Sequence, residues 1–451
     1  MDLTKLPSSE YIKETSKEYS IYVCESRAIP RVTDGFKDGQ RKALWLMRNR
    51  SEKIKTVSLS GELIASNLYL HGDASASEAI SALAAPYKNN IPLLDGEGTF
   101  GTKVAPGAWA APRYTYVRRG TAATNLVYPD LDLVPLRENY DGSTTEPVTF
   151  LPVVPLILLN AVSGIAVGWS TEILPRSLKD LIRATIQALN NQKITALQPS
   201  YAQINQKIEK IGDNSYQFTG TFDRLDAKTI HVTDLPVDLT CEKFVQRLIK
   251  LQEDGTIQDF DDESTEEISI YIKFKRGMIN NWSDEKIINV LKLQTKKTER
   301  IVCIDWSGKA IRQYESAEQL VEDFVEWRFK YYVERYKKLL ADAQYQLQYW
   351  EAYKLCFDGQ LPADLHKIKN RADLFDRINL ITSALNLSDK QLDSLVNLST
   401  YRWTNDYYDE ALEKIQTING EIADYQDHLA HPDKIRDVFK REVKALEKLK
   451  L

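Results

Sequence analysis

Few residues of this sequence could hold a metal or form a disulfide. The four cysteines lie far apart in the 451 residues, and no two have the CxxC spacing that is typical of zinc and redox sites. We expect these thiols to be reduced and structural: Cys24, Cys241, Cys303 and Cys356. His428 and His431 could share a metal by their spacing, but their HLAHPD segment is typical of an exposed helix end. The sequence therefore predicts no metal site in this chain.

A membrane-spanning segment and a signal peptide are also missing. Residues 147–171 carry no charged side chain, and a run of about 20 apolar residues can span a membrane. Prolines and glycines interrupt this run, so a buried strand-turn-strand segment is the better interpretation. The N-terminal sequence MDLTKLPSSEYIKE has no apolar core of the signal-peptide type. We therefore expect a cytoplasmic protein that has no contact with membranes.

An overall positive charge is absent as well. The formal charge is -5, which by itself argues against a nucleic-acid-binding protein. However, residues 27–129 contain fourteen Lys and Arg against eight Asp and Glu, and residues 98–129 contain no acidic residue. Such a local excess attracts phosphates whatever the overall charge. A solvated basic surface without a ligand would have the same composition, so charge alone leaves both interpretations open.

The pattern of the first two thirds of the chain predicts an α+β protein. Residues 1–128 alternate glycine-containing loops with short amphipathic helices, expected near 40–47, 62–68 and 75–84. Short helices joined by tight turns in a basic region suggest a helix-turn-helix or winged-helix module. Residues 129–312 are rich in β signals such as the alternating ISIYIKFK segment, with helices expected near 177–190 and 240–252. This second region is predicted to be a mixed α/β domain.

The last region, residues 313–451, is predicted to be helical. Apolar residues step by four and three in turn from Val325 to Phe357, and the same stepping recurs from Ala411 to Leu429. This spacing is typical of coiled-coil helices. A compact segment, 361–404, lies between the two, so we expect an antiparallel hairpin of long helices with a small globular helical tip. An ordinary helical bundle is the alternative.

Six short motifs between residues 27 and 168 are informative because of their order. They are RAIP at 27–30 with DGFKDGQR at 34–41, HGD at 71–73, DGEGTFG at 95–101, RYT at 113–115, NYDG at 139–142 and NAVSGIAVG at 160–168. Each motif alone is weak, but the ordered set resembles the breakage-reunion subunits of type IIA DNA topoisomerases, the gyrase A and topoisomerase IV A type. The resemblance is greatest to the subunits of T-even-type bacteriophages, where the enzyme is split among separate chains.

The resemblance implies a domain order and an activity. Residues 1–128 would form a winged-helix domain with the catalytic tyrosine, residues 129–312 a tower domain, and residues 313–451 a coiled-coil gate that dimerises. The implied activity is ATP-dependent relaxation and decatenation of DNA through a staggered double-strand break. The implied location is the cytoplasm, that of the host cell if the chain comes from a phage.

Tyr114 of the RYT motif corresponds to the family's nucleophile, which forms a transient 5′-phosphotyrosyl link. A tyrosine phenol has a pKa of about 10 and attacks poorly at neutral pH unless the phenolate or the phosphate charge is stabilised. The adjacent Arg113 is expected to share in catalysis. Further residues are implied to contact DNA: Arg27, Lys37, Arg41, Lys42, His71, Arg118 and Arg119.

Ile165 corresponds to an isoleucine that the family inserts between base pairs, where an apolar wedge unstacks a step and bends the duplex. An isoleucine in an apolar segment is otherwise a core residue, although the flanking Gly164 and Gly168 favour a sharp, exposed turn. Ala74 stands where a serine usually holds quinolone inhibitors, while Glu78 keeps the acidic position. We therefore expect weak quinolone sensitivity.

Departures from the bacterial pattern affect phosphate binding. Tyr69 and Gln40 stand where bacterial relatives carry histidine, which weighs against phosphate contacts at these two positions. Lys42 stands where those relatives carry arginine, and it can still act as a point charge.

Several parts of a complete topoisomerase are not found in the sequence. It has neither a Gly-rich P-loop nor an ATP-lid signature, and it lacks the EGD and DxD acidic set of the Mg²⁺-binding TOPRIM domain. The acidic cluster at 259–263 is expected to be a solvated loop. The resemblance therefore implies that one or more partner subunits bind Mg²⁺ and ATP, while two copies of this chain pair through the coiled-coil seams. Without a gyrase-type DNA-wrapping domain, we expect no strong negative supercoiling.

Two alternatives differ from this interpretation. A non-enzymatic, dimeric DNA-bridging protein could share the architecture, but it has no need of Arg113-Tyr114 on its basic surface. A bacterial gyrase or topoisomerase IV subunit is the other alternative, and the short length of the chain counts against it.

Overall fold

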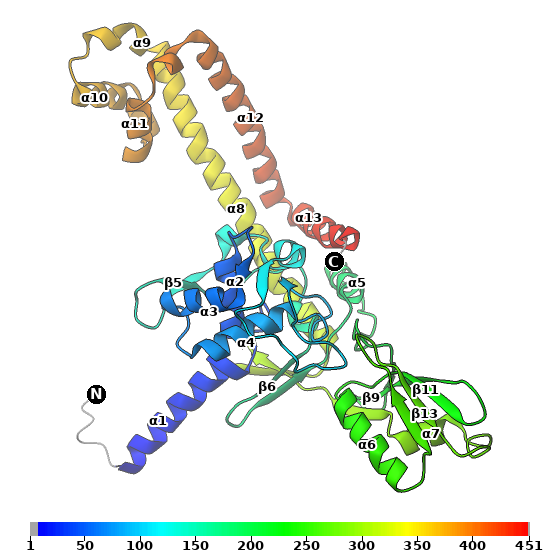
Figure 1. The fold of residues 1–451 in the computed structure, drawn as a ribbon. Coiled ribbons are helices and arrows are strands. Elements are labelled where there is room, and N and C mark those ends of the chain that lie inside the picture. Colours follow the sequence, from blue (N-terminus) through cyan, green and yellow to red (C-terminus); the bar gives the residue numbers. More distant parts are fainter. Residues whose placement is uncertain (1–7, 450–451) are drawn as a thin grey trace. The chain divides into compact units, whose positions relative to one another are not determined.

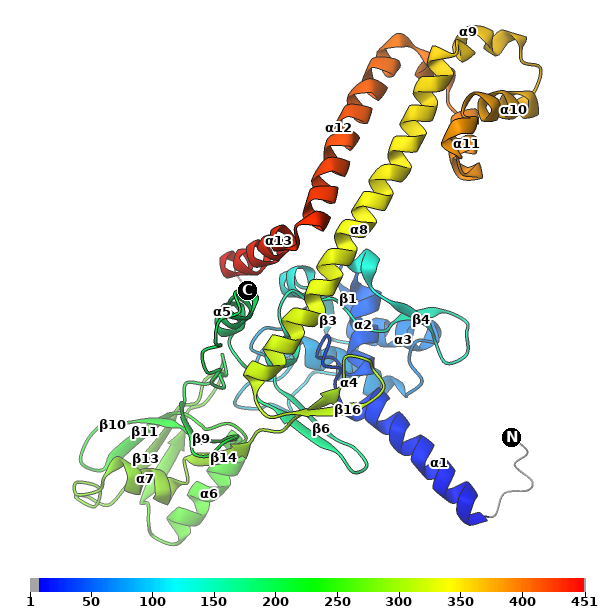
Figure 2. The same ribbon diagram turned by 180° about the vertical axis from the view of Figure 1, so that it is seen from behind.

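The computed structural model describes residues 8–449 and divides the chain into two compact units. Unit 1 comprises the chain up to Arg328 and the segment that begins at Lys440, and unit 2 comprises Phe329–Phe439 (Figure 1, Figure 2). The predicted mixture of helices and strands is confirmed. The division into three domains at 128 and 312 stays a prediction, since both boundaries fall inside unit 1. Residues 1–7, which hold part of the sequence used to argue against a signal peptide, lie outside the described residues.

Three helices and a small antiparallel sheet form the N-terminal part of unit 1. The strands β1 (Ile54–Lys55), β2 (Leu94–Glu97) and β3 (Tyr116–Arg119) pair in the order β1-β3-β2. Of the helices, α2 (Asp38–Met47) and α4 (Asp73–Ala84) lie where the periodicity predicts, whereas α3 (Thr56–Ala65) begins six residues before the expected start. Its first turn contains the β-branched residues Thr56 and Val57, which weaken the helical signal. The preceding α1 (Ser8–Val23) leads into a π-helical turn, Cys24–Ala28.

The uncharged segment at 147–171 has a buried and an exposed half. Beyond the paired strands β4 (Leu136–Glu138) and β5 (Thr145–Pro147), residues 149–159 are all buried. The chain then forms a two-stranded hairpin of β6 (Val162–Ile165) and β7 (Ser170–Ile173), and Glu172 of β7 also bridges to Arg300. A strand-turn-strand is present as predicted, but the expectation that it is buried is wrong for the turn, because the hairpin extends beyond the core.

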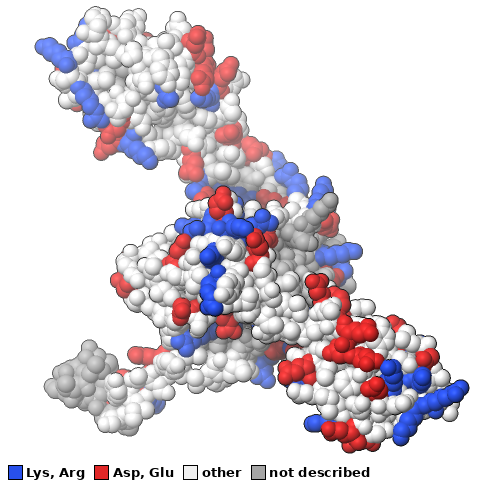
Figure 3. Space-filling model, viewed as in Figure 1, with Lys and Arg blue, Asp and Glu red and all other residues white. Residues whose placement is uncertain are grey.

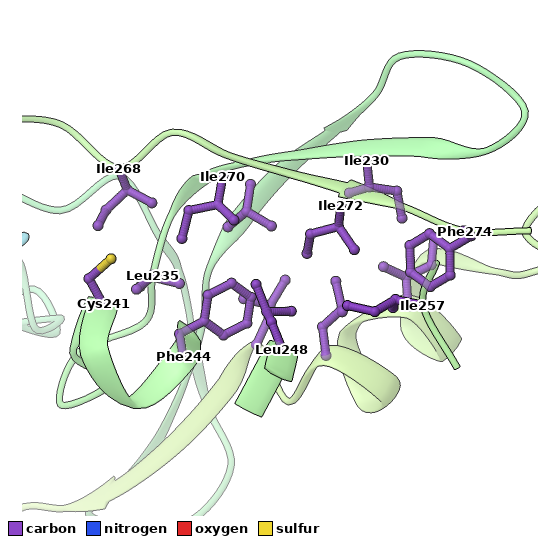
Figure 4. Packing of buried hydrophobic residues seen from close by; sticks show 14 of the residues in the cluster. Ile230, Leu235, Cys241, Phe244, Leu248, Ile257, Ile268, Ile270, Ile272 and Phe274 are labelled. Atoms are coloured by element: carbon purple, nitrogen blue, oxygen red, sulfur yellow. The ribbon is translucent and has the colours of Figure 1, made fainter. Parts of the chain in front are cut away.

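Residues 201–298 form what we call the β-rich lobe. Its four-stranded sheet has the order β10-β11-β13-β12, and its three-stranded sheet the order β14-β9-β8. Phe244 and Leu248 of α6 (Cys241–Glu253) point toward Ile270 and Ile272 of the larger sheet, which builds the lobe's core (Figure 4). The strands are β8 (Lys207–Lys210), β9 (Ser215–Thr219), β10 (Thr221–Arg224), β11 (Thr229–Asp234), β12 (Asp259–Asp262), β13 (Ile270–Lys273) and β14 (Gln294–Thr298).

Sequence patterns predicted some elements around the lobe and missed others. The expected helices at 177–190 and 240–252 are α5 (Leu178–Leu189) and α6. The short α7 (Asp284–Leu291) was not predicted, and the acidic cluster near 259–263 is the edge strand β12 rather than a loop. Strand pairing with β13 sets this conformation, and the acidic side chains stay largely solvated. Two last strands, β15 (Ile301–Ile304) and β16 (Ile311–Tyr314), pair with each other before α8.

Unit 2 is helical. It contains most of α8 (Ala317–Asp358), the short helices α9 (Leu361–Asp364), α10 (Arg371–Ile381) and α11 (Asp389–Val396), then α12 (Asn405–Ala430) and part of α13 (Pro432–Ala445). In α8 and α12, Tyr336 stacks on His428 at 4.6 Å, and Trp350 lies 6.0 Å from Tyr407. These contacts pair the start of one helix with the end of the other, so the two helices are antiparallel, as predicted.

The same contacts show that residues of the two apolar seams pack within one chain. The seam residues Tyr336 and Trp350 of α8 pack against α12 of the same chain. Pairing of two copies through these seams stays a prediction.

The described chain contains no element suited to a membrane and no disulfide. None of the helices among residues 8–449 combines the length and apolar character that crossing a membrane requires. All four cysteines are free and buried, in agreement with the prediction of structural thiols.

We expect the buried ion pair between Arg176 and Glu299 to stabilise unit 1. The guanidinium binds the carboxylate at 2.8 and 2.7 Å and joins the segment before α5 to the segment before β15. Glu299→Gln leaves a buried, unpaired arginine, which we expect to lower the free energy of unfolding by about 3–5 kcal/mol. Urea unfolding measures this change. In the exposed pair of Arg224 and Asp284, Asp284→Asn is the control and should cost less than about 1 kcal/mol; equal losses would contradict the prediction.

Candidate active site

Tyr114 lies in a turn two residues before β3, and hydrogen bonds fix the backbone on both sides of it. Its neighbour Thr115 is buried, and the hydroxyl of Thr115 lies 2.7 Å from that of Thr56 at the start of α3. The backbone N–H of Thr56 donates to the Thr115 carbonyl at 3.0 Å, and the N–H of Tyr114 donates to Ala111 at 2.8 Å. The Tyr114 side chain itself is 65% exposed. A fixed backbone therefore presents an accessible phenol.

Arg113 lies against this phenol. Its guanidinium carbon is 4.7 Å from the centre of the Tyr114 ring, a cation–π contact, and both side chains are exposed. An exposed guanidinium at this position can bind a phosphate oxygen beside the phenol. The two residues that the sequence predicts to be catalytic therefore lie side by side, and both are accessible from solvent.

A groove of about 770 Å³ runs between α4 and the segment before Tyr114. On one wall lie Ala74 and Glu78 of α4, and on the other lie Pro112 and Arg113. The two positions that were expected to be near an inhibitor therefore share one groove with the basic half of the candidate active site.

Arg27 and His71, two of the predicted DNA contacts, form a cluster with Tyr22 of α1. Arg27 Nη2 lies 2.7 Å from His71 Nδ1, and the Tyr22 hydroxyl lies 3.0 Å from His71 Nε2. Burial, and then the charges of Arg27 and Lys42, lower the pKa of His71 below its ordinary value. His71 is therefore a neutral imidazole at pH 7, so the cationic group that this cluster offers to a phosphate is Arg27.

Arg41 and Lys42 differ from the expectation. Arg41 is fully buried, with its guanidinium on Asp34 at 2.6 and 2.8 Å, and Lys42 is buried between Asp38 at 2.7 Å and Glu146 at 2.9 Å. A direct phosphate contact does not fit this burial, since their charges are already neutralised by carboxylates. Both residues hold α2 in place instead.

Of the remaining basic residues that were predicted to contact DNA, one is exposed and two bond to backbone carbonyls. Arg118 is exposed beside Asp95, with Nε 3.1 Å from its carboxylate, whereas the half-buried Arg119 donates to the Arg48 carbonyl at 2.5 Å. Lys37 donates to the carbonyl of Ser163 at 2.7 Å, so it fixes the β6–β7 hairpin. In Figure 3, blue side chains gather over the part of unit 1 where Figure 1 labels α2 and α3, with red ones among them.

Ile165 lies on the β6–β7 hairpin and is 87% exposed, which no core residue would be. Gly164 before it packs on the π-helical turn so closely that a β-carbon would overlap the Ala28 carbonyl oxygen. The hairpin is therefore held at its base by Gly164 and by Lys37, while its apolar side chain projects into solvent.

Two supporting residues were not found by sequence reasoning. Tyr22 contacts His71 across 49 residues, and Thr56 contacts Thr115 across 59. No local pattern signals such pairs. Gln40, which was noted as a departure, accepts a hydrogen bond from the Lys37 N–H at 3.1 Å and so caps α2.

Among residues 8–449, no group of three or more His, Cys, Asp or Glu side chains is placed to hold a metal ion. His428 and His431 instead lie against Asp424 and Asp427 of their own helix end.

Comparison with known proteins gives matches over nearly the whole chain. The protein-family model for the A subunits of DNA gyrase and topoisomerase IV matches residues 27–444. The DNA topoisomerase medium subunit of Enterobacteria phage T4 is 29% identical over 464 residues, which covers 100% of both chains. The DNA topoisomerase 2-alpha of Gallus gallus is 30% identical over 68% of this chain, but this chain spans only 20% of its length.

The fold has a close counterpart among solved structures. The DNA-binding, cleavage and re-ligation domain of Plasmodium falciparum topoisomerase II superposes with a TM-score of 0.81 at 22% identity, covering 96% of this chain and 65% of that one. The family match, which spans far more than half of the sequence, decides the assignment: this chain belongs to the family of DNA gyrase and topoisomerase IV A subunits.

Proposed function

We propose that this chain is the DNA-cleaving and religating subunit of an ATP-dependent type IIA topoisomerase, with Tyr114 as its nucleophile. The observation that carries the proposal is the exposed Tyr114 phenol, which lies against the Arg113 guanidinium at 4.7 Å, in a turn whose next residue, Thr115, is fixed by Thr56. Tyr128 and Tyr201 are poor candidates for the nucleophile, because burial raises the pKa of both phenols.

The proposed reaction is a transesterification. The Tyr114 oxygen attacks a backbone phosphorus, a phosphorus–tyrosine oxygen bond forms, and the bond to the 3′ oxygen breaks. The phenol loses its proton, and the leaving 3′ oxygen gains one. The 5′-phosphotyrosyl product keeps the energy of the phosphodiester, so religation is the same step in reverse. Arg113 stabilises the charge that builds on the phosphate oxygens.

Exposed cations and the hairpin would hold the duplex. Arg27 and Arg118 remain accessible as phosphate contacts, which position a duplex without reading its sequence. Ile165 is proposed to enter the base stack as a wedge, since an exposed apolar residue on a fixed hairpin can unstack one step. Other predicted DNA contacts would position these groups rather than bind DNA themselves: Lys37, Arg41, Lys42 and His71. Arg119 would hold the β1-β3-β2 sheet in place.

The finer architecture and the partners belong to the same proposal. The N-terminal helices and sheet would be the winged-helix domain, the β-rich lobe the tower, and α8 with α12 the coiled-coil gate. Two copies would cut opposite strands, and partner subunits would bind the Mg²⁺ and ATP that type II topoisomerases use. The proposed location is the cytoplasm, that of the host for a phage protein.

Removal of the nucleophile should abolish covalent attachment. We expect Tyr114→Phe, mixed with its partner subunits, Mg²⁺ and 3′-labelled DNA and then denatured, to transfer no label to this chain, because phenylalanine has no attacking oxygen. Tyr140→Phe is the matched control, since Tyr140 is 61% exposed in the same unit, and it should transfer label like the parent chain. Label on Tyr114→Phe would refute the proposed nucleophile.

Truncation of the wedge should reduce both bending and cleavage. We expect Ile165→Ala to lower the bend of a duplex, measured by energy transfer between its labelled ends, and to lower the cleaved fraction about ten-fold, since wedge contacts offset an unstacking cost of a few kcal/mol. Val167→Ala changes another exposed residue of the same hairpin and should have little effect. Equal effects of the two substitutions would count against a specific wedge.

A hydroxyl on the α4 wall of the groove should increase quinolone sensitivity. We expect Ala74→Ser to lower the drug concentration that traps cleaved DNA about five-fold, the equivalent of one added hydrogen bond of about 1 kcal/mol. Trapped complexes are quantified on denaturing gels over a drug series. An unchanged concentration dependence would show that Ala74 does not set the response.

A further inference from the structure

The segment before Tyr114 reaches from the candidate active site into the β-rich lobe. We call residues 98–113 the catalytic loop. Its two arms pair near the active site, where the Ala110 N–H donates to the Thr99 carbonyl at 3.0 Å. Its middle is closed by Trp109, whose indole N–H lies 3.0 Å from the Tyr87 hydroxyl and 2.9 Å from the Pro106 carbonyl. The loop is therefore a braced projection with Tyr114 at one end.

Lys103 holds the tip of the catalytic loop, the part farthest from Tyr114. Its ammonium lies 3.3 Å from Asp234 of β11 and pairs with the Glu267 carboxylate, and its side chain is only 16% exposed. Burial would lower the pKa of Lys103, but the hydrogen bond to Glu267 and the charge of Asp234 raise it above its ordinary value. Lys103 is therefore a permanent cation that the lobe's carboxylates hold.

Packing and hydrogen bonds make the connection rigid on the side of the lobe. Val104, next in the chain, packs against the core cluster of the lobe. Asp234 is buried and also accepts the N–H groups of Asn205 at 2.7 Å and Leu235 at 3.0 Å. A displacement of β11 would therefore be transmitted to the tip of the catalytic loop.

A second lysine joins the hairpin to the same lobe. Lys297 of β14 lies 2.6 Å from Glu172 of β7 and 3.0 Å from Asp238. Both links border one cavity of about 630 Å³, which the catalytic loop, the hairpin and the lobe line together. The elements that carry Tyr114 and Ile165 are thus tied to one body.

We propose that Lys103 is a positioning residue for DNA cleavage: its ion pairs with Asp234 and Glu267 make the β-rich lobe set the place of Tyr114. This inference rests on the proposed function of Tyr114. It also changes the interpretation of residues 98–129 as a phosphate-attracting segment, because Lys103 binds carboxylates of the lobe and not a phosphate. A nucleophile must approach phosphorus within a fraction of an ångström of its reactive position, and a misplacement of about 1 Å can cost 100-fold in rate.

The test compares four variants in the complete enzyme with its partner subunits. Lys103→Met removes the charge and keeps most of the length, Lys103→Arg keeps both, and Glu267→Gln weakens the link from the exposed side of the lobe. Lys243→Met is the matched control, since Lys243 is an exposed lysine that lines the same cavity. Readouts are the covalent fraction on 3′-labelled DNA, the DNA dissociation constant from fluorescence anisotropy, and hydrogen exchange of peptides from the catalytic loop.

We expect Lys103→Met to lower the covalent fraction about ten-fold or more, to leave the dissociation constant within about two-fold, and to speed exchange only in the catalytic loop. Lys103→Arg should restore cleavage, Glu267→Gln should lie in between, and Lys243→Met should match the parent chain.

Parental cleavage by Lys103→Met would overturn the inference, as would a loss of DNA affinity in step with cleavage, which would make Lys103 a DNA contact. Faster exchange throughout unit 1, together with parental behaviour of Glu267→Gln, would also overturn it. Covalent label on Tyr114→Phe would instead refute the proposed function itself, so the two failures are distinguishable.

Discussion

The buried carboxylate of Asp34 is the interaction on which the arrangement of unit 1 depends. It accepts two hydrogen bonds from the Arg41 guanidinium, at 2.6 and 2.8 Å, and one each from the backbone N–H groups of Phe36 and Phe150. One residue thus joins the turn after RAIP, the helix α2 and the buried segment that leads to the hairpin. Without its carboxylate, the buried Arg41 guanidinium would keep only the more distant Asp38, at 3.7 Å, and the loss of a buried charge partner costs several kcal/mol.

The segments that carry the exposed candidate DNA contacts are positioned by these buried contacts. Residues 30–32 bond to β15 through the Val32 N–H and the Ile304 N–H, each at 2.9 Å, which fixes the chain just after Arg27. From the start of α2, Lys37 extends to the Ser163 carbonyl and fixes the hairpin that carries Ile165. The exposed groups are therefore positioned by buried ones only a few residues away, so that the motif residues DGFK act mainly as structural supports.

The distribution of charge explains how a chain of net charge -5 can present a cationic surface. Arg41, Lys42 and Lys103 are neutralised by carboxylates in the interior or at the lobe. Arg113 has an aromatic ring rather than a carboxylate as its contact, so its charge remains available. Counting lysines and arginines along the sequence overstates the surface that a polyanion meets, because the count does not distinguish these two classes.

The parts of the fold that the sequence could predict are those with a regular spacing of apolar residues. The helices α2, α4, α5 and α6 and the two long helices of unit 2 have enough regular apolar spacing to be found, whereas α7 is only eight residues long. The burial of Arg41 could not be predicted, because its partner Asp34 is recognised only when α2 folds back on the preceding turn. The motif order located Tyr114 and Ile165, but no motif indicates what holds them.

The supports of Tyr114 differ in kind on its two sides. After the nucleophile, the chain enters β3 and is fixed within the N-terminal part by the Thr56–Thr115 hydroxyl pair, a contact between buried neutral groups. Before it, the catalytic loop is fixed to the β-rich lobe by an ion pair that is partly accessible to solvent. A neutral buried contact is insensitive to salt, whereas a partly exposed ion pair weakens as ionic strength rises. A gate that must cleave and then reseal needs a nucleophile that stays near the broken end while the surrounding parts move. The two supports contribute differently to that need, because the Thr56–Thr115 contact fixes the chain just after the phenol, whereas the catalytic loop carries the position of the lobe to the phenol from the other side.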